Sequence, residues 1–177
     1  MKVFSYVGPP ELRAQALQTA RVRVQSAEEV RAWSRTQPRG EALIATFVVD
    51  ARGVLWLADR QTEHIACSRG GIVQTAGELG FVADELGVGV VSASNQSTGF
   101  CPRVGSWAFL ERALDAVGLP HPPTWTTAFE FRRCEACGAL NLVKDKWIVC
   151  ATCDADLLPE WNIGNEASVA SHHPDGE

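Results

Sequence analysis

Cys134-Glu135-Ala136-Cys137-Gly138 and Cys150-Ala151-Thr152-Cys153 are the two stretches that decide how the C-terminal part of this chain folds. Each stretch contains a C-x2-C pair, and twelve residues separate the two pairs. Such a pair can direct two sulfur atoms at one point from a tight turn, so two pairs can surround one ion in the tetrahedral arrangement that zinc prefers. We therefore predict one structural zinc ion, bound by Cys134, Cys137, Cys150 and Cys153.

The segment between the pairs is typical of two short strands joined by a turn. Residues 139–143 and 147–149 favour β structure, and the polar Lys144-Asp145-Lys146 separates them. Gly138 permits the positive φ that a tight turn needs, and Asp154 stands at the corresponding place after the second pair. Residues 125–163 thus resemble a zinc ribbon. The resemblance implies a metal and a shape but no activity, because ribbons serve transcription, translation, enzymes and adaptors.

Four cysteines could also form a redox dithiol, disulfides or a rubredoxin-like iron site. Disulfides need an oxidising compartment, and residues 1–10 contain no apolar segment that would direct export. Ligand type and spacing favour zinc over iron. We therefore expect a zinc protein of the cytoplasm.

Composition and charge limit the possible partners. The 177 residues, 46% of them apolar, suffice for one ordinary domain and a small module. No apolar run approaches the roughly 20 residues of a membrane span, so no membrane contact is expected. The net charge is −5, and residues 127–177 carry four basic and nine acidic side chains, whereas residues 1–126 carry twelve of each. Because an acidic surface repels phosphates, nucleic acid is not an expected partner.

The first third of the chain predicts two helices and a strand. Pro9-Pro10-Glu11 favours the start of a helix that runs to about Thr19. The alternation of residues 21–25 predicts a short strand. Ser26-Ala27-Glu28-Glu29 is a capping box and starts a second helix, which ends near Thr36, before Pro38-Arg39-Gly40.

The middle of the chain predicts an antiparallel sheet. Residues 43–49 and 54–58 form a hairpin around the turn at residues 50–53, and residues 64–67, 72–75, 78–81 and 88–92 are expected to be extended. A helix over residues 106–117 follows, with Gly118 closing it. The pattern gives an α+β fold, an antiparallel meander with helices packed on one face.

Four parts of the chain follow from these elements. Residues 1–118 form the α+β domain, and the proline-rich residues 119–124 connect it to the ribbon. The ribbon occupies residues 125–163, beginning with a strand over residues 125–133. Residues 164–177 are small, polar and acidic, and we expect them to be a disordered tail.

Cys101 is the residue that could carry chemistry outside the zinc site. It ends a polar loop just before a predicted helix, where free N–H groups and the helix dipole can lower the pKa of a thiol. His64 is the candidate base. The alternative is that Cys101 packs in the interior, as free cysteines often do. His64 and Cys67 also have an H-x2-C spacing that could contribute to a second metal site with Cys101 and a histidine from His121, His172 or His173. Such a site needs ligands from three separate stretches.

Two weaker resemblances concern the loop that ends at Cys101. A helix, antiparallel strands, Asn95 ahead of Cys101 and then a helix are faintly similar to ubiquitin-conjugating enzymes. The His-Pro-Asn motif of that family is absent, because Ala93-Ser94 precede Asn95, and the spacing from Asn to Cys is shorter. Residues 95–102, the ribbon and Glu160-Trp161-Asn162 together resemble uncharacterised bacterial proteins, which implies no activity.

The function predicted from these features is that of a zinc-stabilised adaptor. The ribbon carries more apolar bulk than about 40 residues can bury internally, so part of it must cover the α+β domain or another protein. The alternative is a cysteine-dependent enzyme, of the acyl or protein-conjugating transferase type, centred on Cys101 with His64. The sequence indicates neither the identity of a partner nor an oligomeric state.

Overall fold

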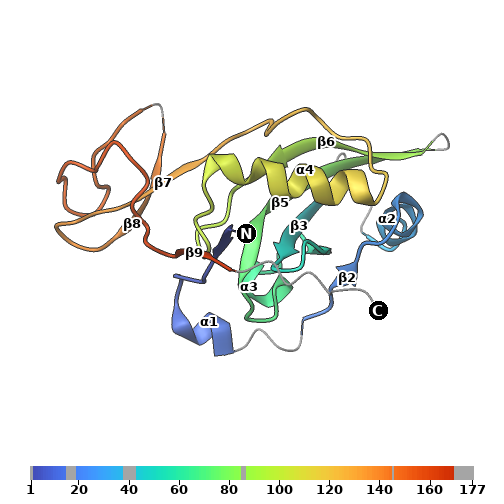
Figure 1. Cartoon of the computed structure of the whole chain (residues 1–177), viewed down its shortest axis with the longest axis horizontal. Helices are drawn as coiled ribbons and strands as arrows, with labels where there is room; N and C mark the ends of the chain where they lie inside the picture. The colour runs from blue at the N-terminus through green and yellow to red at the C-terminus, as the bar shows by residue number, and fades with distance from the viewer. Residues whose placement is uncertain (1, 15–18, 38–42, 85–86, 145, 170–177) are drawn as a thin grey trace.

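The computed structural model describes residues 2–14, 19–37, 43–84, 87–144 and 146–169. A seven-stranded sheet forms the centre of the molecule (Figure 1), with the strand order β2-β4-β3-β5-β1-β9 and with β6 paired to β5. All of its strand pairs are antiparallel. The strands are β1 (Lys2–Phe4), β2 (Val22–Arg23), β3 (Leu43–Asp50), β4 (Leu55–Asp59), β5 (Val73–Ala83), β6 (Val88–Ser94) and β9 (Glu166–Ser168). The predicted α+β class is confirmed.

The hairpin of β3 and β4 forms at the predicted turn. Asp50 Oδ1 accepts hydrogen bonds from the amides of Arg52 (2.8 Å) and Val54 (3.1 Å), and Gly53 adopts a φ of 81°. Such a turn favours an aspartate at its start and glycine where φ is positive. The two extended segments predicted between residues 72 and 81 are one continuous strand, β5, which pairs with β3, β6 and β1.

Helices cover both faces of the sheet. On one face, α2 (Ala27–Ser34) and α4 (Trp107–Ala116) enclose the larger core, to which β3 contributes Phe47. On the other face, α3 (His64–Cys67) packs against Val48 of the same strand. The prediction of helices on one face is therefore wrong. Strand β3 is buried on both sides, which explains why its sequence is a nearly continuous apolar run.

The predicted helix starts and stops are mostly found. Ser26 Oγ accepts a hydrogen bond from Glu29 N (3.3 Å), and the Glu29 carboxylate accepts one from Gln25 N (2.7 Å), so the capping side chains begin α2 as expected. A 3₁₀ turn, η2 (Val104–Ser106), precedes α4, and Gly118 with a φ of 70° follows it. The first helix, α1, is described for Pro10–Ala14. Residues 15–18 of the predicted helix and the predicted stop at residues 38–40 lie outside the described residues.

Residues 64–67 form the helix α3, so their assignment to a strand is wrong. Cys67 N donates to Glu63 O (3.0 Å), and Ser68 N donates to His64 O (2.9 Å). These are helical bonds over four residues. A run of four residues is too short for its apolar pattern to separate a helix from a strand.

The C-terminal segment is anchored in the sheet. Strand β9 pairs with β1, and the amide group of Asn165 donates to Ser5 O (2.6 Å) and Phe100 O (2.8 Å). The expected disorder is therefore wrong for Glu166–Ser168, whose small and polar side chains conceal backbone pairing with the other end of the chain. Residues 170–177 of the predicted tail lie outside the described residues. The division at the proline-rich connection stays a prediction.

Trp125 belongs to the core of the sheet rather than to the C-terminal module. Its ring lies 5.1 Å from that of Trp107 and 6.4 Å from that of Phe47, measured between centroids. The strand predicted over residues 125–133 is formed only by β7 (Glu130–Arg133). None of the helices in the described part of the chain is long and apolar enough to cross a membrane.

Candidate metal centre

The four cysteines lie in a small module that extends from one end of the sheet (Figure 1). We call residues 130–158 the cysteine module. Strand β7 pairs antiparallel with β8 (Leu140–Val143), and the turn between them carries the first cysteine pair. Lys144 and Trp147 form a bridge at the predicted hairpin turn, and Val149 bridges to Asp156 after the second pair. Each cysteine pair thus sits in a turn whose two ends are held together by backbone pairing.

The first turn has the geometry that aims two sulfur atoms inward. Cys134 N donates to Ala139 O (2.9 Å), and Gly138 N donates to Cys134 O (2.8 Å). Gly138 has a φ of 77°, a conformation in which a side chain would be strained. The glycine after the first pair therefore serves the turn, as predicted.

The second turn repeats the first. Cys150 N donates to Ala155 O (2.8 Å), and Asp154 N donates to Cys150 O (3.0 Å). Asp154 has a φ of 57°, in the place of Gly138. Aspartate is among the few residues with a side chain that visit this region. The two C-x2-C turns are therefore equivalent in backbone structure.

The four sulfur atoms converge on one point. All lie within 4.8 Å of one another, with 3.6 Å between those of Cys134 and Cys153 and 3.7 Å between those of Cys137 and Cys150. A disulfide requires about 2.05 Å, so these are separate thiols. Four sulfurs at about 2.3 Å from a central ion stand about 3.8 Å apart in a regular tetrahedron. The cluster is thus positioned to hold a metal ion, and its four ligands are the ones the sequence predicts.

Asn141 supports this cluster, although the sequence analysis did not identify it. Its side chain is buried on β8, donates to Ala139 O (3.0 Å) and to the sulfur of Cys150 (3.6 Å), and accepts from Ala151 N (2.9 Å). The amide of Thr152 also donates to the Cys150 sulfur (3.4 Å). These donors, the Thr152 amide first, lower the pKa of Cys150 to about 6. An asparagine within an apolar strand, where it is rare, was the available signal.

The cysteine module is fastened to the rest of the protein by an arginine and two asparagines. Arg132 is buried and donates to Leu158 O (3.0 Å) at the end of the module and to Pro159 O (2.6 Å) just beyond it. Asn162 exchanges two hydrogen bonds with the backbone of Arg133, at 2.8 Å and 2.7 Å.

The rest of the described chain, which we call the body, holds the segment that enters the module through Asn95. Asn95 donates to Pro102 O (3.0 Å) and Phe129 O (2.8 Å) and accepts from Phe129 N (2.7 Å). The side-chain amides of Asn95 and Asn162 each donate to and accept from backbone groups, as a neighbouring strand would. The module is therefore attached by directed hydrogen bonds as well as by apolar contacts.

Cys101 lies in the apolar contact between body and module. It is fully buried with Phe131 and Ile163, and its φ is 45°. Its sulfur donates to Thr98 O at 3.1 Å. Burial raises the pKa of the Cys101 thiol to about 12. The thiol is therefore protonated at neutral pH, the opposite of what an activated nucleophile needs.

His64 does not meet Cys101 as a base would. Its Nε2 lies 3.0 Å from the carbonyl oxygen of Gly77, a distance at which the N–H donates to that carbonyl. Loss of hydration lowers the pKa of His64 to about 4, so the imidazole is neutral at pH 7. The polar atoms of the two residues have different partners, so His64 is not paired with Cys101.

The second metal site suggested by the H-x2-C spacing does not form in the described part of the chain, outside which His172 and His173 lie. There, the four cysteines are the one group of three or more potential ligands that come together. Cys67 is buried, and burial raises the pKa of its thiol to about 12.

Comparisons with protein-family models, with curated proteins and with solved structures find no match to this chain. Function must therefore be inferred from the geometry described above.

Proposed function

We propose that this protein is a zinc-stabilised adaptor whose cysteine module binds another protein. The observation that carries the proposal is Trp147, whose exposed fraction is 70% on a turn of the module. A tryptophan is highly buried on average, and exposed tryptophans concentrate at the centres of protein interfaces. Zinc is the proposed ion because four thiolates in a tetrahedron suit it well.

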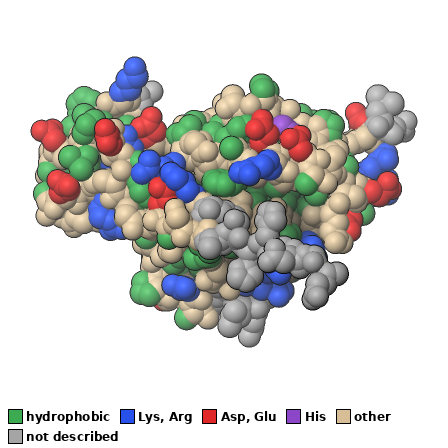
Figure 2. All heavy atoms as spheres, in the orientation of Figure 1, with side chains coloured by type: hydrophobic (Ala, Val, Ile, Leu, Met, Phe, Trp, Pro, Cys, Tyr) green, Lys and Arg blue, Asp and Glu red, His purple; other side chains and the backbone are tan. Residues whose placement is uncertain are grey.

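Apolar side chains remain exposed on the module after its attachment to the body is complete. Phe131 and Leu157 are buried, whereas Ile148 and Leu158 are exposed. Ile148 follows Trp147 in the sequence, and its carbonyl accepts a hydrogen bond from Leu157 N (2.8 Å), the residue before Leu158. Figure 2 shows hydrophobic side chains among acidic ones on the module, at the left of the view. Contacts with the body bury some of the apolar side chains of the module, and contacts with a partner would bury those that remain exposed.

The charges favour a protein partner over nucleic acid. Lys144 and Lys146 precede Trp147, but Glu135, Asp154 and Asp156 are exposed on the same small module. Binding to phosphates draws most of its affinity from basic side chains, which the acids offset here. A cytoplasmic location stays a prediction.

A pull-down with matched variants tests this proposal. Trp147→Ala removes the exposed ring, and Val91→Ala removes a side chain of β6 that is similarly exposed, at 53%. We expect extracts of the native host to yield a protein that binds wild type and Val91→Ala but not Trp147→Ala, and we expect the purified pair to bind directly. Elemental analysis must show zinc in all three proteins. Capture that is the same with and without Trp147 would contradict the proposal.

A further inference from the structure

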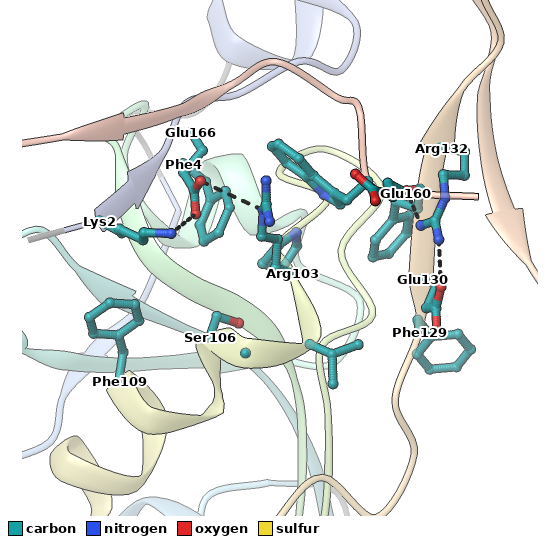
Figure 3. A pocket seen from close by; sticks show the side chains of 15 residues that line it. Lys2, Phe4, Arg103, Ser106, Phe109, Phe129, Glu130, Arg132, Glu160 and Glu166 are labelled. Carbon is teal, nitrogen blue, oxygen red and sulfur yellow. Dashed lines mark hydrogen bonds and ion pairs between the residues drawn. The ribbon is translucent and has the colours of Figure 1, made fainter. Parts of the chain in front are cut away.

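A hollow of about 550 Å³ lies where the cysteine module meets the body (Figure 3). We call it the junction pocket. Its walls come from β1, from Pro102 to the start of α4, from β7 and from residues 160–166. Small-molecule sites typically occupy roughly 300–1,000 Å³ and occur preferentially between structural units. The junction pocket fits this description in size and in place.

One wall of the pocket carries two cations and one carboxylate. Lys2 Nζ lies 3.4 Å from one oxygen of Glu166, and Arg103 Nε lies 3.6 Å from the other. Figure 3 shows both contacts on the same side of the pocket. The side chains of Lys2 and Arg103 are 58% and 45% exposed, respectively. This wall therefore has one positive charge more than its own carboxylate can neutralise.

Arg103 keeps the binding part of its guanidinium available. Its contact with Glu166 uses Nε, and within the described chain its two terminal NH2 groups form no ion pair. A guanidinium grips a carboxylate best through two parallel N–H bonds. The group also lies 4.4 Å above the ring of Trp161, which holds it in place.

The opposite wall supplies no further cation. Arg132 is buried and is bound to Glu130 Oε2 at 2.7 Å and to three backbone carbonyls, so four of its five N–H donors are occupied. Glu160, which is exposed, adds a negative charge to the lining. A ligand with one negative charge fits this balance better than one with two, because the acids of the lining repel the second charge.

Aromatic rings form much of the remaining surface. Phe109 of α4, Phe129 ahead of β7 and Trp161 all line the pocket and are half-buried. Flat rings of this kind favour a flat apolar ligand through stacked or edge-to-face contacts. The pocket thus combines an anion site with an aromatic one.

We propose that the junction pocket binds a small organic monoanion, a carboxylate attached to an aromatic ring. The carboxylate lies on Arg103 and Lys2, and the ring lies among Phe109, Phe129 and Trp161. This binding activity is separate from the proposed adaptor function and does not depend on it.

Nuclear magnetic resonance of the metal-loaded full chain tests the proposal with two matched probes. The probes are 2-naphthoate and its neutral amide, which share one ring system. The signal observed is the indole N–H of Trp161, assigned from Trp161→Phe. We expect 2-naphthoate to shift this signal in a saturable way and to bind about fivefold more tightly than the amide, the upper effect of a partly exposed ion pair. Equal binding of the two probes, or no shift with either, would overturn the proposal.

Two substitutions separate the site from general loss of structure. Arg103→Gln should abolish the preference for the carboxylate, whereas Glu166→Gln frees both cations and should tighten binding of 2-naphthoate about fivefold. Arg60→Gln, on an exposed residue outside the pocket, is the control for net charge. A gain in affinity cannot arise from misfolding. An unchanged affinity in Glu166→Gln would overturn the assignment of the anion to this wall.

Discussion

His64 should make the stability of the protein depend on pH between about 4 and 6.5. Its pKa is about 4 in the folded protein, against about 6.5 in an unfolded chain, so the unfolded state binds more protons in this window. The stabilisation is therefore complete above pH 6.5 and is lost as the pH falls towards 4. Integrating over the window gives a loss of about 1.4 kcal/mol at pH 5.5 and about 2.6 kcal/mol at pH 4.5. Because part of His64 reaches solvent, these are upper values.

Urea unfolding of wild type and His64→Gln at several pH values measures this effect. Glutamine can still donate to the carbonyl of Gly77 but does not titrate in this range. Acid also protonates the thiolates and releases the metal, but it does so equally in both proteins. The free energy of unfolding of wild type minus that of His64→Gln should therefore decrease as the pH falls. A difference that stays constant from pH 7.5 to 4.5 would refute a lowered pKa for His64.

Three further predictions concern the metal and the buried thiol. Removing the ion with a chelator should unfold the cysteine module, because structural zinc contributes on the order of 10 to 16 kcal/mol to folding. The unfolding should appear as rapid amide hydrogen exchange in β7 and β8, and full protection there without metal would count against a structural ion. Asn141→Ala should weaken zinc binding about 10- to 100-fold in a chelator competition, whereas Thr152→Ala, which keeps the backbone donor, should not weaken it. Equal effects of the two substitutions would show that the Asn141 side chain does not support the metal site. Cys101 should react with iodoacetamide no faster than an ordinary thiol at neutral pH, and Cys101→Ser should still fold and bind a partner. Selective labelling of Cys101 below pH 7 would restore the enzyme hypothesis.

The parts of the structure that the sequence predicts are the local ones. The C-x2-C pairs, the turn glycine at Gly138 and the cap at Ser26 each act within a few residues, so their spacing in the sequence is their spacing in the fold. The four cysteines that cluster could be named for the same reason. Strand β3 was predicted for a similar reason, because residues 43–49 form a nearly continuous apolar run of strand length that ends at a turn.

The parts that the sequence did not predict depend on distant partners. Asn95, Asn141 and Asn165 are buried, and each bonds backbone groups that lie far away in the chain or across a turn. Asn95 and Asn165 look like loop residues in the sequence, and only Asn141 stands in a predicted strand. The pairing of β9 with β1 joins the two ends of the described chain and leaves no local pattern. The interior packing of Cys101 was one of the two predictions for that residue, but Phe131 and Ile163, which bury it, lie far away in the chain and could not be named.

The anchoring of both ends of the cysteine module changes what metal binding has to achieve. Between Phe129, which Asn95 holds at the end of β6, and β9, which pairs with β1, the chain forms a loop of roughly 35 residues. Closing a free loop of that length costs about 3 kcal/mol in chain entropy. The sheet meets this cost when it folds, before any ion arrives. A metal-free chain should therefore be a folded body with a closed loop, ready to recapture its ion, and the ion has only the inside of that loop left to order.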